Sequence, residues 1–269
     1  MPTIQEQFFD IGANLTHESF EADLDDVISK AQESGVKRFS ITGSSLNESI
    51  SAIEIAKKFP NSCISTAGIH PHNAKEYSPS SFSEIRDLLE EDVVKSIGET
   101  GLDFYRNFSA AKQQELSFEA HMELAIETRY PLFLHERDAH KRFIEIISPY
   151  KEDLPKSVVH CFTGNKEALE KYIEMGFYIG ITGWLCDERR GKHLIDLIPI
   201  IPLDKLMIET DCPYLLPRDM GIDNSTRNEP QFLKHIAGRI AEIRPESKEL
   251  LFSAIYMNSL DFFDITFQE

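Results

Sequence analysis

Strand-like and helix-like patterns alternate along the whole of this 269-residue chain, and this alternation limits the folds open to it. Short runs of apolar and β-branched residues predict buried strands, at 8–15, 37–43, 63–69, 93–98, 131–136, 157–162, 177–182 and 205–211. Apolar residues at three- and four-residue spacing predict helices, at 18–34, 47–59, 109–129, 138–149, 166–175, 190–198, 229–243 and 246–263. This alternation is typical of an α/β fold with a parallel sheet.

Eight such strands can close into a TIM-type (β/α)8 barrel or remain an open, doubly wound sheet. Ionisable side chains follow five of the predicted strands, including the first and the last. In a closed barrel these strand ends surround one mouth, whereas the first and last strands of an open sheet are usually far apart. We therefore predict the barrel. No internal repeat or Pro/Gly-rich linker interrupts the sequence, which predicts one domain over residues 1–269.

The five ionisable residues share a setting, because each lies where an apolar run gives way to a polar loop. They are Asp10, Glu99, His135, His160 and Asp211. One buried charge at a strand end is often structural, but the same arrangement at five strands indicates a shared partner. A divalent metal ion bound by carboxylates and neutral imidazoles would offset the desolvation cost of all of them. The two histidines end successive strands in matching positions, and the residues alone leave a metal pair and two hydrogen-bonded core histidines equally open.

Further residues of the predicted mouth suit phosphate chemistry. Asp211 precedes Cys212-Pro213, a position that suits an acid that binds metal and accepts a proton from the attacking water, although a turn or capping acid is the alternative. His70, in the motif GIHPH (68–72), is a candidate phosphate donor or proton carrier. Arginines that could bind phosphate follow several strands, at Arg106, Arg137, Arg189, Arg190, Arg218 and Arg227. The same loops contain the aromatic residues Phe104, Tyr105, Phe108, Trp184 and Tyr214, for which base stacking and packing against the barrel rim both remain open.

Composition excludes several classes of function. The formal net charge is −17, and a uniformly acidic surface repels nucleic acid, which argues against a high-affinity, non-specific DNA-binding module. An enzyme that acts on phosphates is not excluded, because bound cations reverse the field inside a cleft. No apolar stretch approaches the ~18 residues that span a bilayer, and the N-terminus does not resemble a signal peptide, so we expect no membrane partner and a cytoplasmic location. Four scattered cysteines without a C-x-x-C pair predict reduced core residues.

With these residues in this order, the chain resembles the TatD-type metal-dependent nucleases, which belong to the amidohydrolase-like barrel hydrolases. The resemblance covers nearly the whole chain. It is carried by DIGANLT (10–16), ITGSSLNES (41–49), STAGIHPH (65–72), IGETGLDFYRNFS (97–109), HERDAHKRF (135–143), VVHCFTG (158–164), YIGITGWLCDERRG (178–191), IETDCPYLLPRD (208–219) and RNEP (227–230). It implies a metallo-dependent hydrolase fold and a magnesium-dependent 3′→5′ exonuclease that acts on single-stranded DNA or RNA. It further implies a monomer in the cytoplasm with a role in DNA repair or nucleic-acid turnover.

The resemblance also implies roles for individual residues. Glu99 would ligate or bridge the metal ions, and His135 and His160 would supply nitrogen ligands. Asp211 would bind metal and orient the attacking water, while His70 would assist with the phosphate. Further candidates for contact with the substrate phosphate are His72 and Arg137.

One motif departs from the wider family. That family begins with D-x-H-x-H, whereas this chain has Gly12 and Asn14 in the two histidine positions. Asn14 offers only a carbonyl oxygen, for a weak or water-mediated metal contact. The missing imidazoles favour a harder ion such as Mg²⁺ over Zn²⁺, with Mn²⁺ or Zn²⁺ as alternatives and one or two ions per chain.

Two other functions remain as alternatives. A metal-dependent amidase or esterase would be expected to have the H-x-H pair, and often a carbamylated lysine where this chain has Glu99. A degenerate barrel could bind nucleotides without catalysis. The presence of Glu99, His135, His160 and Asp211 together argues against this last reading.

Overall fold

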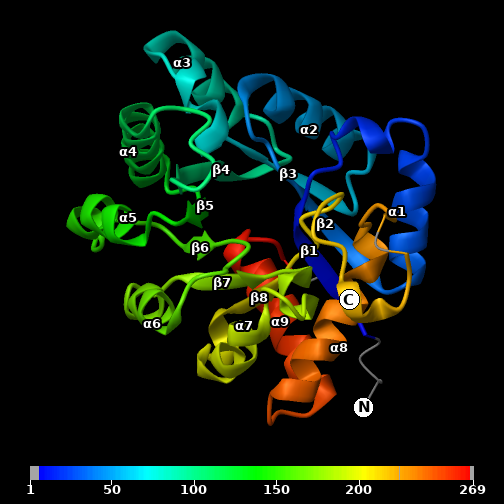
Figure 1. The fold of residues 1–269 in the computed structure, drawn as a ribbon. Coiled ribbons are helices and arrows are strands. Elements are labelled where there is room, and N and C mark those ends of the chain that lie inside the picture. The colour runs from blue at the N-terminus through cyan, green and yellow to red at the C-terminus, as the bar shows by residue number, and fades with distance from the viewer. Residues whose placement is uncertain (1–5, 224, 267–269) are drawn as a thin grey trace.

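Eight parallel strands form one sheet in the computed structural model, which describes residues 6–223 and 225–266. Each strand pairs with the next one along the chain, and Figure 1 shows them arranged around a central axis with the helices outside. The strands are β1 (Phe8–Ala13), β2 (Val36–Ile41), β3 (Cys63–Ala67), β4 (Val94–Asp103), β5 (Leu132–Arg137), β6 (Ser157–Val159), β7 (Tyr178–Ile181) and β8 (Leu206–Ile208). The predicted TIM-type barrel is therefore confirmed.

Helices follow the strands and cover the outer face of the barrel. They are α1 (Leu24–Glu33), α2 (Leu46–Lys58), α3 (Pro79–Leu88), α4 (Ala111–Thr128), α5 (His140–Ile147), α6 (Lys166–Glu174), α7 (Lys192–Leu197), α8 (Leu233–Ile243) and α9 (Lys248–Phe262). Among the described residues, none of these helices has the length and apolar character needed to cross a membrane. The predicted domain, 1–269, extends beyond the described residues at both ends and stays a prediction.

The largest differences from the sequence prediction concern three elements. The segment predicted as a helix at 18–34 begins as a 3-10 turn, Glu18–Phe20, and α1 starts only at Leu24. The sequence patterns did not predict α3, which has a single fully buried apolar side chain, Ile85, and depends on a capping box between Ser78 and Ser81. β4 continues to Asp103, five residues beyond its predicted end at position 98, and this extension carries Glu99 into the strand.

Alternation along the strands explains why ionisable groups collect at the mouth. A small apolar cluster, with members from six strands, fills the lower barrel interior, and side chains of α9 complete it. Residues two apart along a strand point to the same face. At the ends of three strands an ionisable residue therefore follows an apolar member of this cluster by two positions and points to the same face: His135 after Phe133, His160 after Val158, and Glu209 after Met207.

Asp10 does not share the metal site, and the expectation that it would is wrong. It lies between Phe9 and Ile11, which both belong to the interior cluster, so its side chain points to the opposite face of β1. Its buried carboxylate accepts hydrogen bonds from the backbone N–H (2.9 Å) and the hydroxyl of Thr210. Asp10 thus joins β1 to the end of β8 and closes the barrel at the seam between its first and last strands.

Substitution of Gly101 should destabilise the fold. Its φ of +138° is a conformation that other residues rarely adopt, and a Cβ there would overlap the carbonyl oxygen of His135 on β5. We expect Gly101→Ala to lower the free energy of unfolding by roughly 2–4 kcal/mol. Gly238 in α8 is a matched control, because no atom lies within 4 Å of a Cβ there. Gly238→Ala should stabilise the protein by about 0.5–1 kcal/mol. Urea unfolding measures both, and equal midpoints for the two variants would contradict this account.

Asp10 should make stability depend on pH. Burial is the largest influence on its carboxyl and raises the pKa to about 8, although the hydrogen bonds from Thr210 act in the opposite direction. The folded protein therefore retains a proton that the unfolded chain loses near pH 4, and stability falls as pH rises from about 4 to about 8. Asn keeps the hydrogen bonds of the protonated acid and does not titrate. The stability of Asp10→Asn relative to the wild type should thus increase over this range, by several kcal/mol at its upper end. A difference in urea unfolding that does not change with pH would refute this.

Candidate metal centre and active site

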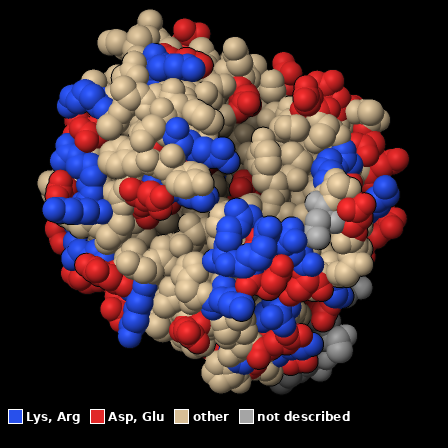
Figure 2. Space-filling model, in the orientation of Figure 1, with Lys and Arg blue, Asp and Glu red and all other residues tan. Residues whose placement is uncertain are grey.

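The C-terminal ends of the strands surround a cavity of about 750 Å³. Figure 2 shows it as a hollow in the molecular surface with Lys and Arg side chains beside it. Asp10 does not line this cavity, whereas eight of the residues that the sequence predicted for the site do: Asn14, His70, His72, Glu99, His135, Arg137, His160 and Asp211.

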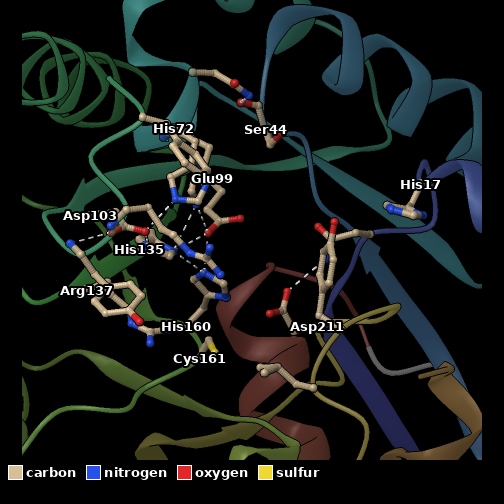
Figure 3. Close-up of a pocket in the computed structure, with 18 of the residues that line it drawn as sticks. His17, Ser44, His72, Glu99, Asp103, His135, Arg137, His160, Cys161 and Asp211 are labelled. Carbon is tan, nitrogen blue, oxygen red and sulfur yellow. Dashed lines mark hydrogen bonds and ion pairs between the residues drawn. The ribbon is translucent and has the colours of Figure 1, made fainter. Parts of the chain in front are cut away.

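The centre of the site is one carboxylate oxygen that faces three imidazoles. Oε1 of Glu99 lies 2.6 Å from Nε2 of His160, 2.8 Å from Nδ1 of His135 and 3.1 Å from Nε2 of His70. Nδ1 of His135 also lies 3.3 Å from the facing nitrogens of both other histidines. In Figure 3, His135 and His160 converge on Glu99 from two different strands. His70 was predicted to contact phosphate, yet its ring belongs to this cluster.

These atoms fit a single divalent ion. Ligands about 2.1 Å from one ion are separated from each other by roughly 3.0–3.4 Å. The facing atoms of Glu99, His70 and His135 lie 2.8, 3.1 and 3.3 Å apart, near this spacing, whereas Glu99 and His160 are 2.6 Å apart. Imidazole nitrogens that face one another cannot all carry protons, so a cation among them resolves the conflict. The residues whose ligand atoms lie near enough to one another to hold it are Glu99, His70 and His135; His160 faces Glu99 beside them.

Burial and charge set the protonation of this cluster. Burial lowers the pKa of His70 to about 4, so its imidazole is neutral. Its Nδ1 accepts the backbone N–H of His72, so the ring proton lies on Nε2, toward Glu99, and would leave if a metal ion bound there. Burial opposes the ionisation of Glu99, but the neighbouring His160 and His70 outweigh it and hold the pKa of this carboxyl well below its usual range. Burial likewise opposes a charge on His160, but Glu99 and Glu209 raise its pKa well above the ordinary value. Metal binding would displace that proton.

Glu209 was not predicted as a site residue. Its fully buried carboxylate accepts the backbone N–H of Cys161 and lies 3.3 Å from Nδ1 of His160. A Cβ at Gly12 or Gly180 would overlap this carboxylate. The lack of a side chain at position 12 therefore makes room for Glu209, which fixes the orientation of the His160 ring. The sequence could have indicated this role, because Glu209 directly follows β8 and comes two residues after Met207, which belongs to the interior cluster.

Asp103 was also not predicted, because the strand that carries it was expected to end at position 98. Its Oδ2 lies 2.7 Å from Nε2 of His72 and 3.5 Å from Nε2 of His135. Burial opposes its ionisation, but the nearby His135 and the hydrogen bond from His72 hold the pKa of Asp103 far below its usual range. Asp103 therefore orients His72 through its Nε2 and lies close to Nε2 of His135.

Asp211 faces the histidine cluster across the cavity (Figure 3). Its left-handed φ of +54° turns the chain just beyond β8, and its Oδ1 accepts a hydrogen bond of 2.9 Å from Nδ2 of Asn14. Burial raises the pKa of Asp211 to about 7, helped by Glu99 and Glu209 and opposed by His160. An acid with this pKa can take up a proton at neutral pH. Asn14, in place of the second family histidine, therefore orients this acid.

The structure separates the arginines that the sequence could not distinguish. Four of the six pair with carboxylates: Arg189 and Arg190 with Asp187, Arg218 with Glu188, and Arg227 with Asp23 and Glu229. The guanidinium of Arg137 instead lies between two rings, 4.7 Å from Tyr105 and 4.9 Å from Trp184. Within the described part of the chain Arg137 forms no ion pair with a carboxylate. Its charge is therefore available to an anion in the cavity.

Comparison with known proteins agrees with this geometry. The model of the family described as "TatD related DNase" matches residues 9–264. The chain is 46% identical over 260 residues to the 3′-5′ ssDNA/RNA exonuclease TatD of Salmonella typhimurium, covering 96% of this chain and 100% of that protein.

Solved structures show the same fold. A TatD homologue of Escherichia coli K12, YJJV, superposes with a TM-score of 0.89 at 23% identity, covering 96% of this chain and 98% of that one. A TatD-family hydrolase of Entamoeba histolytica has a TM-score of 0.85 at 30% identity, with 97% and 99% covered. On the family match and the identity to its relatives, this chain belongs to the TatD-related DNase family.

Proposed function

We propose that this protein is a metal-dependent exonuclease that hydrolyses phosphodiester bonds from the 3′ end of single-stranded DNA or RNA. The observation that carries the proposal is the shared cavity, in which the Glu99–histidine cluster faces Asp211 and an unpaired Arg137. The relative from Salmonella typhimurium is named for this activity, which supports the same reaction here. A deep mouth at the end of a barrel also admits a strand end more readily than the interior of a duplex.

Each wall of the cavity has its own part in the reaction. A divalent ion bound by Glu99 and the three histidines would stabilise the negative charge that develops on the phosphoryl oxygens and would ease the deprotonation of water. Asp211, with its pKa near 7, accepts the proton of the attacking water. Arg137 binds phosphate oxygens with a guanidinium that its two neighbouring rings hold in place, and His72 lines the same cavity.

The ligand types and the family resemblance indicate which ion the site would bind. Mg²⁺ is the ion that the family resemblance implies, and it prefers oxygen ligands. The presence of His70 in the cluster gives three imidazoles, which makes Mn²⁺ or Zn²⁺ a specific alternative. A second ion would lie toward Asp211 and the carbonyl oxygen of Asn14.

The cellular setting belongs to the same proposal. We propose a monomer that acts in the cytoplasm, in DNA repair or nucleic-acid turnover. The resemblance to TatD-type nucleases supports this setting.

Digestion of an end-labelled oligonucleotide tests the reaction, its direction and its ion together. A 5′-labelled single strand should shorten progressively with Mg²⁺, Mn²⁺ or Zn²⁺ and should stay intact with EDTA. Glu99→Gln should weaken metal binding measured by calorimetry, by about 10–100-fold or more, and reduce cleavage accordingly. Metal-independent cleavage, or turnover of amides and carboxylic esters in place of oligonucleotides, would refute the proposal.

Replacement of Asp211 should separate catalysis from binding. Asp211→Asn keeps the size of the side chain but cannot accept the proton of water, so we expect kcat to fall by about 10²–10⁴-fold. Oligonucleotide affinity measured by fluorescence anisotropy should stay within a fewfold of the wild type. Asp10→Asn, at the barrel seam, is the matched control and should retain full activity. Full activity of the Asp211 variant would remove this acid from the mechanism.

A further inference from the structure

The most exposed aromatic side chains in the described part of the chain all lie at the cavity. Among the described residues, only three aromatic side chains have more than half of their surface exposed: Tyr105 (58%), Phe108 (59%) and Tyr214 (53%). All three line the catalytic cavity. Exposed rings are costly to keep on a soluble surface, and their concentration at one opening marks a binding site.

These rings lie on two sides of the mouth. Tyr105 and Phe108 belong to the loop after β4, whereas Tyr214 belongs to the loop after β8. The ring of Phe108 lies 4.8 Å from that of His72, edge to face, and so adjoins the histidine cluster. The ring of Tyr214 lies 5.7 Å from that of His17, beside Asp211.

The neighbours of Tyr105 indicate what the rings bind. Its ring covers the guanidinium of Arg137, which lies in turn over Trp184, and Arg190 lies 4.3 Å from the centre of the same indole. A cation that can bind phosphate, Arg137, therefore lies next to an exposed ring, that of Tyr105, whereas the indole of Trp184 is buried. Phosphates and planar bases likewise lie next to each other along a polynucleotide.

We propose that Phe108, Tyr105 and Tyr214 are the stacking surfaces for the bases of a single strand as its end enters the cavity. This inference rests on the proposed nuclease function and specifies how that site holds its substrate. Stacking needs only the face of a base, so the surface accepts any sequence. Paired bases of a duplex present no free face to it.

The net charge of the protein supports a binding mode in which stacking of bases contributes to affinity. Formal net charge is −17, so the overall field opposes the approach of a polyanion. Lys and Arg side chains beside the hollow offset that field locally (Figure 2). Stacking between neutral rings is not opposed by the field, and it can supply the affinity that phosphate contacts lack here.

Phe108 provides the cleanest test, because its ring contacts His72 and no arginine, as far as the described residues show. The probe is a 5′-fluorescein oligothymidylate, compared with an oligonucleotide of equal length whose 3′-terminal residues are abasic. Affinity is measured by anisotropy in EDTA, where cleavage is absent. The variants are Phe108→Ala, Phe108→Trp and Tyr214→Ala. Leu250→Ala, on α9 and 54% exposed, is the control for loss of an exposed apolar side chain outside the cavity.

We expect Phe108→Ala to bind the base-bearing strand about tenfold more weakly, equivalent to ~1.4 kcal/mol, and the abasic strand as the wild type does. Phe108→Trp should restore tight binding, and Leu250→Ala should match the wild type with both probes. The salt dependence of binding should not change in Phe108→Ala, because no phosphate contact is lost.

Equal effects of Phe108→Ala on the base-bearing and abasic strands, or no effect on either, would overturn the stacking proposal. Failure of the nuclease proposal has a different signature. A wild-type protein that releases no nucleotide with any of the three metals fails that test regardless of how Phe108 affects binding in EDTA.

Discussion

One oxygen of Glu99, shared by three imidazoles, is the interaction on which the functional part of this structure depends. A buried carboxylate and three buried ring systems would be costly to desolvate separately. Their convergence reduces that cost only if positive charge is present among them, as protons or as a metal ion. The folded protein therefore bears the desolvation cost of a cation site before any cation binds. The surrounding residues hold the histidine cluster rigid.

Rigidity comes from a second layer of carboxylates. Glu209 contacts His160 from the β8 side, and Asp103 contacts His72 and His135 from the end of β4. Each of these acids is itself confined, since Glu209 lies against two glycines and Asp103 accepts backbone N–H groups of its own loop. Such contacts fix which ring nitrogen faces the ion and tune how strongly it binds.

The cavity has two chemically different walls. On one side lie the histidine cluster and Arg137, stacked between aromatic rings. On the other lies Asp211, held by Asn14. A phosphate placed between them meets cationic groups on one face and a proton acceptor on the other. This polarity is what hydrolysis of a phosphodiester requires, and it persists in a chain whose total charge is strongly negative.

The amino-acid sequence predicts the barrel, because eight apolar segments alternate with amphipathic helices and ionisable residues follow both the first and the last of these segments. It also located Glu99, His135 and His160, each at the exit of an apolar run, where the chain must reach the mouth. Tertiary structure decided the rest, since each remaining feature depends on residues far apart along the chain. Asp10 turned away from the mouth because β1 alternates its faces, and His70 joined the cluster because a loop from β3 brings it to Glu99. Glu209 and Asp103 became supporting acids through contacts across strands. Only the pairing of four arginines with carboxylates distinguished them from Arg137 and Arg106, for which the described residues show no ion pair. The local sequence pattern predicts which residues end a strand. It does not predict which residues from other strands contact them in the closed barrel.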